Sequence, residues 1–343
     1  MKKIAIVILN WNGRKFLEKF LPDVIRYSHN LAHIVVADNA SDDDSVAWLG
    51  STFPEVERIC LDKNYGFTGG YNRALKQVQA DYYVLLNSDV EVSAGWLKPL
   101  YDFMESHPDA AACQPKIRSY LDRTLLEHAG AAGGYIDYLG YPFCRGRIYN
   151  TLEKDQGQYD SIEQVFWATG ACLFIRAQVF HDQQGFDDFF FAHMEEIDLC
   201  WRIQQSGKAI YVIPESVIYH VGGGTLPKSN PRKTYFNFRN NLVMLFKNLP
   251  GHRLVWLIPL RLLLDGIAGA KFMLDGDFKD TLAVLRAHFA FYRYVLRSFP
   301  ARKRQQKQVL RHPTKGIYHR SIVLAYYLKK IKYFHQLSQK DFS

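Results

Sequence analysis

The chain has 343 residues, 48% of them hydrophobic, and a formal net charge of +9, which suits one large or two ordinary globular domains. Its five cysteines are odd in number and include no Cys-x-x-Cys pair. This pattern indicates neither a disulfide framework nor a cysteine-rich zinc site, and it favours a reducing cytoplasm. The apolar run at residues 4–9 is shorter than the ~7–15 residues of a signal peptide core, so we expect a buried first strand.

The positive charge is concentrated at one end of the chain. Residues 251–343 contain 18 Lys and Arg against 5 Asp and Glu, whereas the first 250 residues contain 25 against 29. The longest uncharged apolar piece of this tail, residues 254–260, is far shorter than the ~18–20 residues that span a bilayer. We therefore predict two parts, a domain at 1–250 and a basic tail at 251–343 that can lie on a membrane surface.

The first 90 residues alternate apolar runs with helical patterns, which is typical of βαβ units and a parallel sheet. The predicted strands are 4–9, 33–37, 57–61 and 82–86, and the predicted helices are 14–27, 45–53 and 68–79. Each strand is followed by polar residues. Because ligands bind beyond the carboxyl ends of strands in such sheets, these polar clusters should meet at one crevice.

The remaining segments are predicted more coarsely. Residues 114–164 mix glycine, tyrosine and turn residues, so we expect loops and short strands. Apolar strands are predicted at 166–175, 209–213 and 215–220, with a helix at 94–103 and further helices after residue 247.

An acidic tract follows an aromatic run at residues 189–202, FFFAHMEEIDLCWR. On a helix beginning near His193, Glu195, Asp198 and Arg202 share one face and Glu196 points about 100° away. Burial beside other acids would raise a carboxyl pKa toward that of a general base. Acids in the first turn of an ordinary helix, favoured by its dipole, explain the tract equally well.

Two further residues end apolar strands and could bind a cation. Asp89 follows the strand at 82–86, with Asn87 two residues earlier, and a strand-end carboxylate is a common ligand of hard cations. His220 ends another strand and precedes Gly222, Gly223 and Gly224. A turn-capping Asp and a core His remain the alternatives.

Taken together, the motifs resemble glycosyltransferase family 2 enzymes of the GT-A fold, in the bacterial rhamnosyltransferase-like branch. The matching pieces, in family order over roughly residues 3–248, are VILNWNG, ADNASDD, NYGFTGGYNRAL, LLNSDVEV, WATGACLFIR, GFDDFFFAHMEEIDLCWR and YHVGGGT. The resemblance implies a GT-A domain with a C-terminal helical extension. It implies transfer of a sugar from a nucleotide diphosphate sugar, of UDP or dTDP type, to an acceptor hydroxyl.

The resemblance also implies site residues. Asp38 matches the acid near the nucleoside, and Asp89 is the last acid of a metal motif whose first acid is here Asn87. His220 matches a metal-coordinating histidine, so Mg²⁺ or Mn²⁺ is expected on Asp89 and His220. The positions implied to bind the nucleotide sugar are Asn10, Asp38, Asn39, Asn64, Gly66, Asn72, Asn87, Ser88 and Asp89.

The pair Glu195-Glu196 occupies the family's acidic pair, from which the catalytic base comes. We expect Glu195 to be the base of an inverting transfer, with Glu196 and Asp198 as alternatives. Trp201 and Arg202 are expected to be structural. No Arg-Trp dipeptide of the processive synthases occurs in the chain, so one or a few sugars should be added.

The tail carries an amphipathic pattern. Its apolar residues recur at spacings of 3 and 4, and Arg286, Arg293 and Arg297 flank them on one side. Such a helix suits an anionic membrane surface. A helix packed on its own domain is the alternative. The stripe comprises Leu282, Leu285, Phe289, Tyr292, Leu296 and Phe299.

The sequence thus favours an inverting, metal-dependent glycosyltransferase acting on a glycan or lipid-linked acceptor in cell-envelope polysaccharide assembly. It should be cytoplasmic, or peripheral on the inner face of the membrane, and should not bind nucleic acid. The alternatives are a nucleotidyltransferase of similar fold, which normally needs a Gly- and Lys/Arg-rich loop after the first strand, and a nucleic-acid-binding protein that uses the basic tail.

Overall fold

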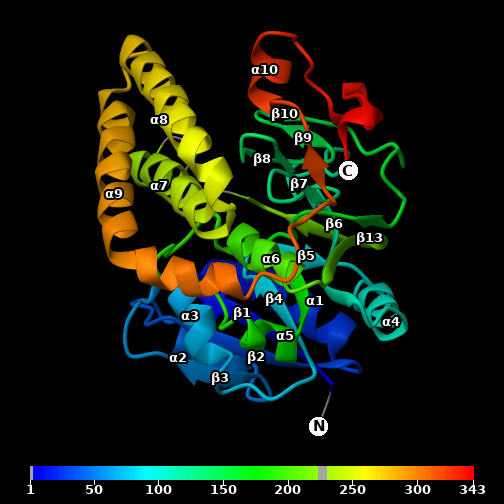
Figure 1. Cartoon of the computed structure of the whole chain (residues 1–343). Helices are drawn as coiled ribbons and strands as arrows, with labels where there is room; N and C mark the ends of the chain where they lie inside the picture. Colours follow the sequence, from blue (N-terminus) through cyan, green and yellow to red (C-terminus); the bar gives the residue numbers. More distant parts are fainter. Residues whose placement is uncertain (1–2, 223–229) are drawn as a thin grey trace.

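Two β-sheets organise the computed structural model, which describes residues 3–222 and 230–343 (Figure 1). The large sheet contains, in spatial order, β11 (Glu163–Gln164), β13 (Ala209–His220), β6 (Ala110–Ser119), β12 (Cys172–Arg176), β4 (Tyr82–Asn87), β1 (Ile4–Asn10), β2 (Ala32–Asp38) and β3 (Glu57–Cys60), with β5 (Val90–Val92) paired to β13. The small sheet contains β10 (Thr151–Leu152), β9 (Arg147–Ile148), β8 (Pro142–Cys144), β7 (Gly134–Asp137) and β14 (Ile317–Tyr318).

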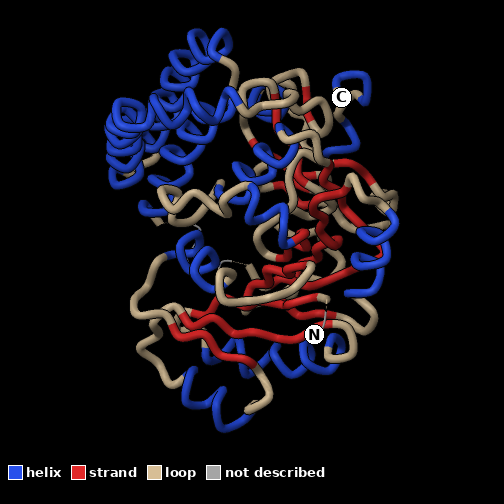
Figure 2. Tube along the Cα trace, turned by 60° about the horizontal axis from the view of Figure 1, so that its bottom comes forward, coloured by secondary structure: helices blue, strands red, loops and turns tan. Residues whose placement is uncertain are grey.

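Helices cover both faces of the large sheet and form a separate group at one side (Figure 2). They are α1 (Arg14–Ser28), α2 (Ser45–Thr52), α3 (Gly66–Ala74), α4 (Leu97–Ser106), α5 (Ala177–Asp182), α6 (Glu195–Gln205), α7 (Pro231–Asn248), α8 (Gly251–Leu274), α9 (Phe278–Lys307) and α10 (Ile322–Tyr327), with 3₁₀ turns at Phe334–Gln336 and Gln339–Asp341.

The parallel half of the large sheet confirms the predicted α/β class. β4, β1, β2 and β3 pair in parallel, and α1, α2 and α3 connect them. Strand β1 reads IAIVILN and is buried nearly throughout, because helices lie on both faces of the sheet. One core contains Leu17 of α1 and Leu100 of α4, and the other contains Tyr71 of α3 and Leu199 of α6.

The strand register brings the predicted site residues together. Asn10 lies opposite Asp38 on β2, and Leu9 lies opposite Asn87 on β4. The carboxyl ends of these strands therefore meet at one edge, as the sequence predicts.

Some predicted elements have different bounds. The helix predicted at 68–79 is α3, Gly66–Ala74, and the strands predicted at 209–213 and 215–220 are one strand, β13, with an irregularity between Ile213 and Val217. The strand predicted at 166–175 is shorter. Its first part leaves the large sheet, because Trp167 bridges to Gly134 of β7, and only Cys172–Arg176 pairs with β4.

The predicted tail at 251–343 consists of two structurally different pieces. Helices α8 and α9 form an antiparallel hairpin against α7 at one side of the molecule (Figure 1). The chain then returns, and β14 pairs with β7 while Phe334 and Phe342 pack on Tyr135. Within the described ranges, no helix is both long and apolar enough to cross a membrane.

Candidate active site

At the ends of β1 and β2, a hydrogen-bonded cluster surrounds Asp38. Asn10 Nδ2 donates to Asp38 Oδ1 at 2.9 Å and to Ser45 Oγ at 3.0 Å. The backbone N–H and the hydroxyl of Ser41 donate to Asp38 at 2.9 and 2.6 Å. Asp38 is 5% exposed, so its orientation is fixed by these donors. The sequence predicts that Asn10 and Asp38 act together, and the structure brings them into contact.

A second cluster links Asn39 to the start of α3. Asn39 Nδ2 donates to Asn64 Oδ1 at 3.1 Å and to the Gly66 carbonyl at 3.0 Å. Gly66 has φ +72°, and a Cβ there would lie 2.6 Å from the Phe191 ring, so glycine is required by conformation and by packing. The resemblance implies that Asn64 and Gly66, at this helix start, bind the nucleotide sugar. In the structure, the Phe67 and Thr68 N–H groups donate to the Phe191 carbonyl.

Asn72 is placed differently from the sequence expectation. Its Nδ2 donates to the Phe186 carbonyl at 2.8 Å and to Asp188 Oδ1 at 2.7 Å, and its Oδ1 accepts from the Phe186 N–H at 2.9 Å. Both ends of the amide are therefore used within the protein. Asn72 attaches α3 to the loop before α6 rather than presenting its side chain to a nucleotide sugar.

Asp89 and His220 meet as predicted, and a third residue joins them. His220 Nε2 lies 3.2 Å from Asp89 Oδ1, and His220 Nδ1 lies 3.1 Å from Glu127 Oε2. All three side chains are at least 88% buried. Burial opposes protonation of His220, but the two carboxylates raise its pKa to about 10.

Sequence reasoning missed Glu127. It lies in the segment without clear periodicity, and no motif marks it. A partial signal is Gly222, which has φ +70° and whose Cβ would lie 2.6 Å from Glu127 Oε1. The first glycine after β13 thus leaves room for this carboxylate. Gly223 and Gly224 lie outside the described residues.

The two adjacent glutamates at the start of α6 face different surroundings. Glu196 shares a helix face with Cys200, whose Sγ accepts from the Ala168 N–H at 3.4 Å, and its Cβ lies beside Gly170. Glu195 shares a face with Asp198, which contacts α7. Glu195 is only 5% exposed, whereas Glu196 keeps partial exposure. Glu196 is therefore the more accessible acid.

Both glutamates are held in an environment that disfavours their charge. Burial and the neighbouring Glu196 raise the pKa of Glu195, and burial raises the pKa of Glu196. Among the described residues, Glu195 Oε2 and Glu196 Oε2 are buried without a hydrogen-bond partner. A buried acid with an unpaired oxygen is suited to accept a proton from a bound hydroxyl.

The segment entering α6 is strained and is held in place by α7. Phe191, His193 and Met194 have φ of 65°, 70° and 71°, which costs such residues roughly 1–3 kcal/mol each. Asn240 Nδ2 of α7 donates to the carbonyls of Phe190, Ala192 and His193 at 2.7–3.0 Å. Asn240 was not expected from the sequence, because only the fold places α7 against this segment.

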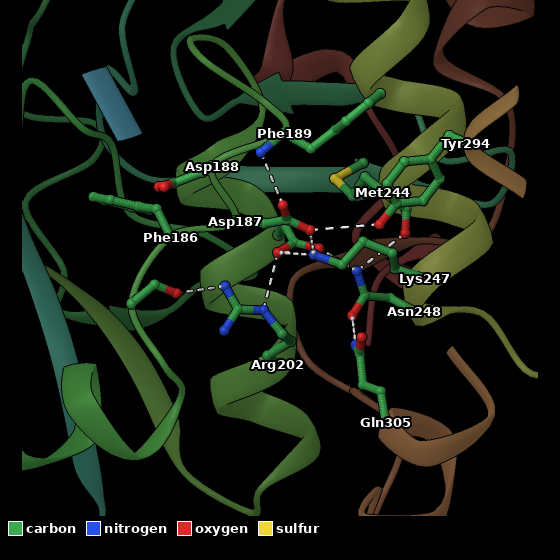
Figure 3. A network of polar contacts seen from close by, with 12 residues as sticks. Phe186, Asp187, Asp188, Phe189, Arg202, Met244, Lys247, Asn248, Tyr294 and Gln305 are labelled. Atoms are coloured by element: carbon green, nitrogen blue, oxygen red, sulfur yellow. Dashed lines mark hydrogen bonds and ion pairs between the residues drawn. The ribbon is translucent and has the colours of Figure 1, made fainter. Parts of the chain in front are cut away.

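Asp198 belongs to a buried ion-pair network, and Figure 3 labels its partners Arg202, Lys247 and Asn248. Its Oδ2 accepts from Arg202 Nε and Lys247 Nζ, both at 2.9 Å, and its Oδ1 accepts from Asn248 at 2.8 Å. Burial opposes its ionisation, but Lys247 and Arg202 lower its pKa overall. A carboxylate paired in this way is a poor base. Of the three acids considered as the base, Asp198 is therefore the one whose contacts indicate a structural role. The structural role predicted for Arg202 fits this network.

A cavity of about 520 Å³ lies beside this network rather than at the strand ends. It is lined by Asp187, Arg202, Lys247 and Tyr294, among others, and by none of the residues that surround Asp38 or Asp89. The candidate site is therefore defined by the strand ends and the start of α6, not by this cavity.

Comparison with known proteins identifies the family. The model of "Glycosyl transferase family 2" matches residues 5–181, which is more than half of the chain. The chain belongs to glycosyltransferase family 2. The matched region of this glycosyltransferase includes the Asp38 cluster, Asn87, Asp89 and Glu127. Because the chain belongs to this family, the two alternative functions, a nucleotidyltransferase and a nucleic-acid-binding protein, are set aside.

Two curated relatives support the rhamnosyltransferase-like resemblance. The glycosyltransferase is 26% identical over 239 residues to an N-acetylglucosaminyl-diphospho-decaprenol L-rhamnosyltransferase of Mycobacterium tuberculosis, covering 65% of this chain and 77% of the relative. It is 23% identical over 200 residues to the rhamnosyltransferase WbbL of Escherichia coli K12, covering 56% of this chain and 72% of the relative.

Solved structures confirm the GT-A fold. Residues 1–349 of S. aureus TarS in complex with UDP-GlcNAc align with a TM-score of 0.56 at 14% identity, covering 90% of this chain and 88% of that chain. The mannosyltransferase PcManGT of Pyrobaculum calidifontis, in complex with GDP-Man and Mn²⁺, aligns with a TM-score of 0.52 at 12% identity, covering 90% and 85%.

Proposed function

We propose that this glycosyltransferase moves a sugar, with inversion, from a nucleotide diphosphate sugar to a hydroxyl of a glycan or lipid-linked acceptor in cell-envelope polysaccharide assembly. One curated relative named above is, by its name, an L-rhamnosyltransferase of N-acetylglucosaminyl-diphospho-decaprenol, and the other is a rhamnosyltransferase. The two solved structures of similar fold contain UDP-GlcNAc or GDP-Man. We place the nucleoside at Asp38, Asn10 and Asn39. Asn87 and Ser88 lie at the neighbouring strand end, on the path to Asp89.

We assign the base to Glu196, the alternative that the sequence left open, instead of Glu195. The acceptor hydroxyl must reach the base, and Glu196 is the partly exposed member of the pair, whereas Glu195 is buried. Glu196 takes the proton from the acceptor oxygen as that oxygen bonds to the anomeric carbon. The bond from this carbon to the diphosphate oxygen breaks, and the diphosphate leaves with the electron pair. Glu195 remains a buried carboxyl group beside the base and takes no part in the proton transfer.

We propose that Asp89 and His220 hold a divalent cation, Mg²⁺ or Mn²⁺. Their facing atoms are 3.2 Å apart, and Glu127 can accept the Nδ1 proton of His220. A cation would take the place of the Nε2 proton that faces Asp89, so that Nε2 would act as a ligand. Within the described ranges, no cluster of three or more His, Cys, Asp or Glu could hold a metal alone. Two protein ligands suit a cation completed by diphosphate oxygens and water. Such a cation would supply positive charge to the departing diphosphate.

The domain division also remains a proposal. We retain residues 1–250 as the catalytic unit, and we add the returning segment 317–343, because β14 and Phe334 pack on the small sheet. The α8–α9 hairpin is then the appended piece. We propose that the enzyme works at the inner face of the cell membrane, where a lipid-linked acceptor would be available.

The buried acid pair with unpaired oxygens carries the proposal, because this arrangement costs stability unless a ligand uses it. The test is a panel of UDP, dTDP and GDP sugars with Mn²⁺ or Mg²⁺, measured by thermal stabilisation. One nucleotide class should raise the melting temperature, and only with metal. A panel without any stabilisation, followed by no transfer to lipid-linked acceptors, would contradict the proposal.

Glu127 provides a prediction that separates positioning from folding. Glu127→Ala should weaken Mn²⁺ binding by roughly 10–100-fold, because a carboxylate behind a ligating histidine fixes its ring and tautomer. Glu127→Gln keeps an acceptor for Nδ1 and should lose less. Calorimetric titration of Mn²⁺ into folded protein measures this. Unchanged affinity in Glu127→Ala would restrict Glu127 to a structural role.

A second prediction concerns Asn240. Asn240→Asp keeps the shape of the side chain but turns an oxygen toward three carbonyls. The free energy of unfolding should therefore fall by about 3 kcal/mol, and turnover per folded molecule should also fall. The matched control is Asn241→Asp, since Asn241 donates to the Gly140 carbonyl instead. The control should lose stability but keep turnover. Denaturant unfolding and initial rates together report both effects, and equal turnover in the two variants would refute the positioning role.

A further inference from the structure

The amphipathic stripe of α9 faces solvent. Its six apolar side chains are 51–81% exposed, and we call them the α9 stripe: Leu282, Leu285, Phe289, Tyr292, Leu296 and Phe299. The opposite face of α9 is the packed one, with Ala283, Val284, Ala287 and Phe291 buried. Of the two readings that the sequence leaves open, the stripe is therefore not part of the protein's own core. A row of exposed large apolar residues marks an interaction surface.

The charge beside the stripe is positive. Arg286, Arg293 and Arg297 are exposed, and each directly follows a stripe residue. Asp280 is the one acidic residue of α9, near its start. Exposed Lys303 and Arg304 continue the positive charge toward the end of the helix. An apolar surface bordered by arginines on one side matches an anionic lipid surface, since apolar side chains enter the acyl boundary while arginines contact phosphates.

Helix α8, the other arm of the hairpin, adds apolar surface of its own. Val255, Leu263, Ile267 and Leu274 are 60–88% exposed. Its two central charged residues, Arg261 and Asp265, are turned inward and buried. Both helices of the hairpin thus present large apolar side chains outward, which is the reverse of an ordinary solvated helix pair.

The packed face of α9 connects this surface to the candidate active site. The ring of Tyr294 lies 4.4 Å from the ring of Phe189, and its hydroxyl lies 3.5 Å from Asp187 Oδ2 (Figure 3). Lys247 of α7 joins Asp187 to Asp198 of α6 in the same network. Helix α9 therefore carries the stripe on its exposed face and contacts, with its packed face, the segment that leads to Glu196.

We propose that the α9 stripe docks the enzyme on an anionic membrane surface, with Arg286, Arg293 and Arg297 contacting lipid phosphates. The docking is inferred from the exposed apolar side chains and arginines of α9 alone. Docking would deliver a lipid-linked acceptor to Glu196, and this consequence rests on the proposed function. Binding to vesicles is measured without substrate, so its outcome is independent of whether the transfer reaction is assigned correctly.

The experiment measures co-sedimentation of the full chain with phosphatidylcholine vesicles with and without phosphatidylglycerol. Binding should require the anionic lipid and weaken with salt. Replacing Leu285, Phe289 and Leu296 together by Ser should reduce the partition coefficient by at least tenfold. Replacing the three arginines by Gln should reduce it by about fivefold per arginine, and this loss should vanish in high salt.

The matched control replaces Leu121 and Leu328, which are 80% and 73% exposed outside the hairpin, by Ser. This control should bind vesicles like the unaltered protein, and all variants should keep their melting temperature because the replaced side chains are exposed. The proposal is overturned if the stripe variant binds as well as the control. It is also overturned if sedimentation velocity shows a lipid-free dimer that the stripe variant converts to monomer, since a second copy would then cover the stripe.

Discussion

Replacing Glu196 by Gln should lower turnover by about 10²–10⁴-fold and leave donor affinity nearly unchanged. Gln keeps the size of the side chain and most of its hydrogen bonding but cannot take a proton from the acceptor. In the proposed site the donor contacts the strand ends and Glu196 acts on the acceptor, so binding of the nucleotide sugar should survive. Initial rates at saturating donor, together with donor titration by calorimetry, measure the two quantities separately.

The same change at Glu195 is the internal control. Glu195→Gln should keep most of the turnover, because Glu195 is 5% exposed and lies on the helix face directed at α7. If Glu195→Gln is the inactive variant, the base is the residue that the sequence first favoured. If both variants are active, the acidic pair is only a charged helix start and the proposed site fails.

The raised pKa values give the pair a pH signature. Since the base must be unprotonated, turnover should fall with decreasing pH at a value above the ordinary glutamate range. The free energy of unfolding should depend on pH in the opposite sense, and should be larger at low pH. Because the folded state raises the pKa of Glu195, stability declines as pH rises from the unfolded value through the folded one. Glu195→Gln should therefore melt higher than the unaltered protein at pH 8, with a smaller difference near pH 4.

The sequence predicts the strand ends better than the start of α6. Asn10, Asp38 and Asn87 each end an apolar run, and parallel pairing alone places them side by side. The choice between Glu195 and Glu196 depends on what packs against each helix face. Those partners, Ala168 for one face and Asn248 for the other, are distant in sequence and have no pattern that links them to the pair.

Contacts between residues distant in sequence also explain why the sequence did not reveal Glu127 and Asn240 and why it did not reveal the contacts of Asn72. Each acts through contacts across more than 40 residues of chain, in places where periodicity carries no information. The α9 stripe shows the complementary case. Its spacing predicts an amphipathic helix correctly, but the apolar side of a helix is buried in most globular proteins. Only the packing of Phe291 on the opposite face shows that this stripe is the exposed one.

Removing Asp89 should have the largest effect on donor binding. Asp89→Ala should abolish the metal-dependent part of donor affinity, and His220→Ala should weaken it, because each removes one of the two proposed protein ligands of the cation. EDTA should have the same effect on the unaltered protein, and added Mn²⁺ should reverse it. Calorimetric titration of the nucleotide sugar, with and without Mn²⁺, measures the metal-dependent part directly.

The variants also distinguish a metal site from a purely structural triad. Asp89 and Glu127 both contact the His220 ring, so a structural role predicts that Asp89→Ala and Glu127→Ala destabilise the fold similarly and affect donor binding only through unfolding. A metal role predicts an order in Mn²⁺ affinity: Asp89→Ala loses most, His220→Ala less, and Glu127→Ala least, since Glu127 acts only through the histidine. If EDTA leaves donor binding and turnover unchanged, the cation is not needed, and the contact between Asp89 and His220 serves to join β13 to the end of β4.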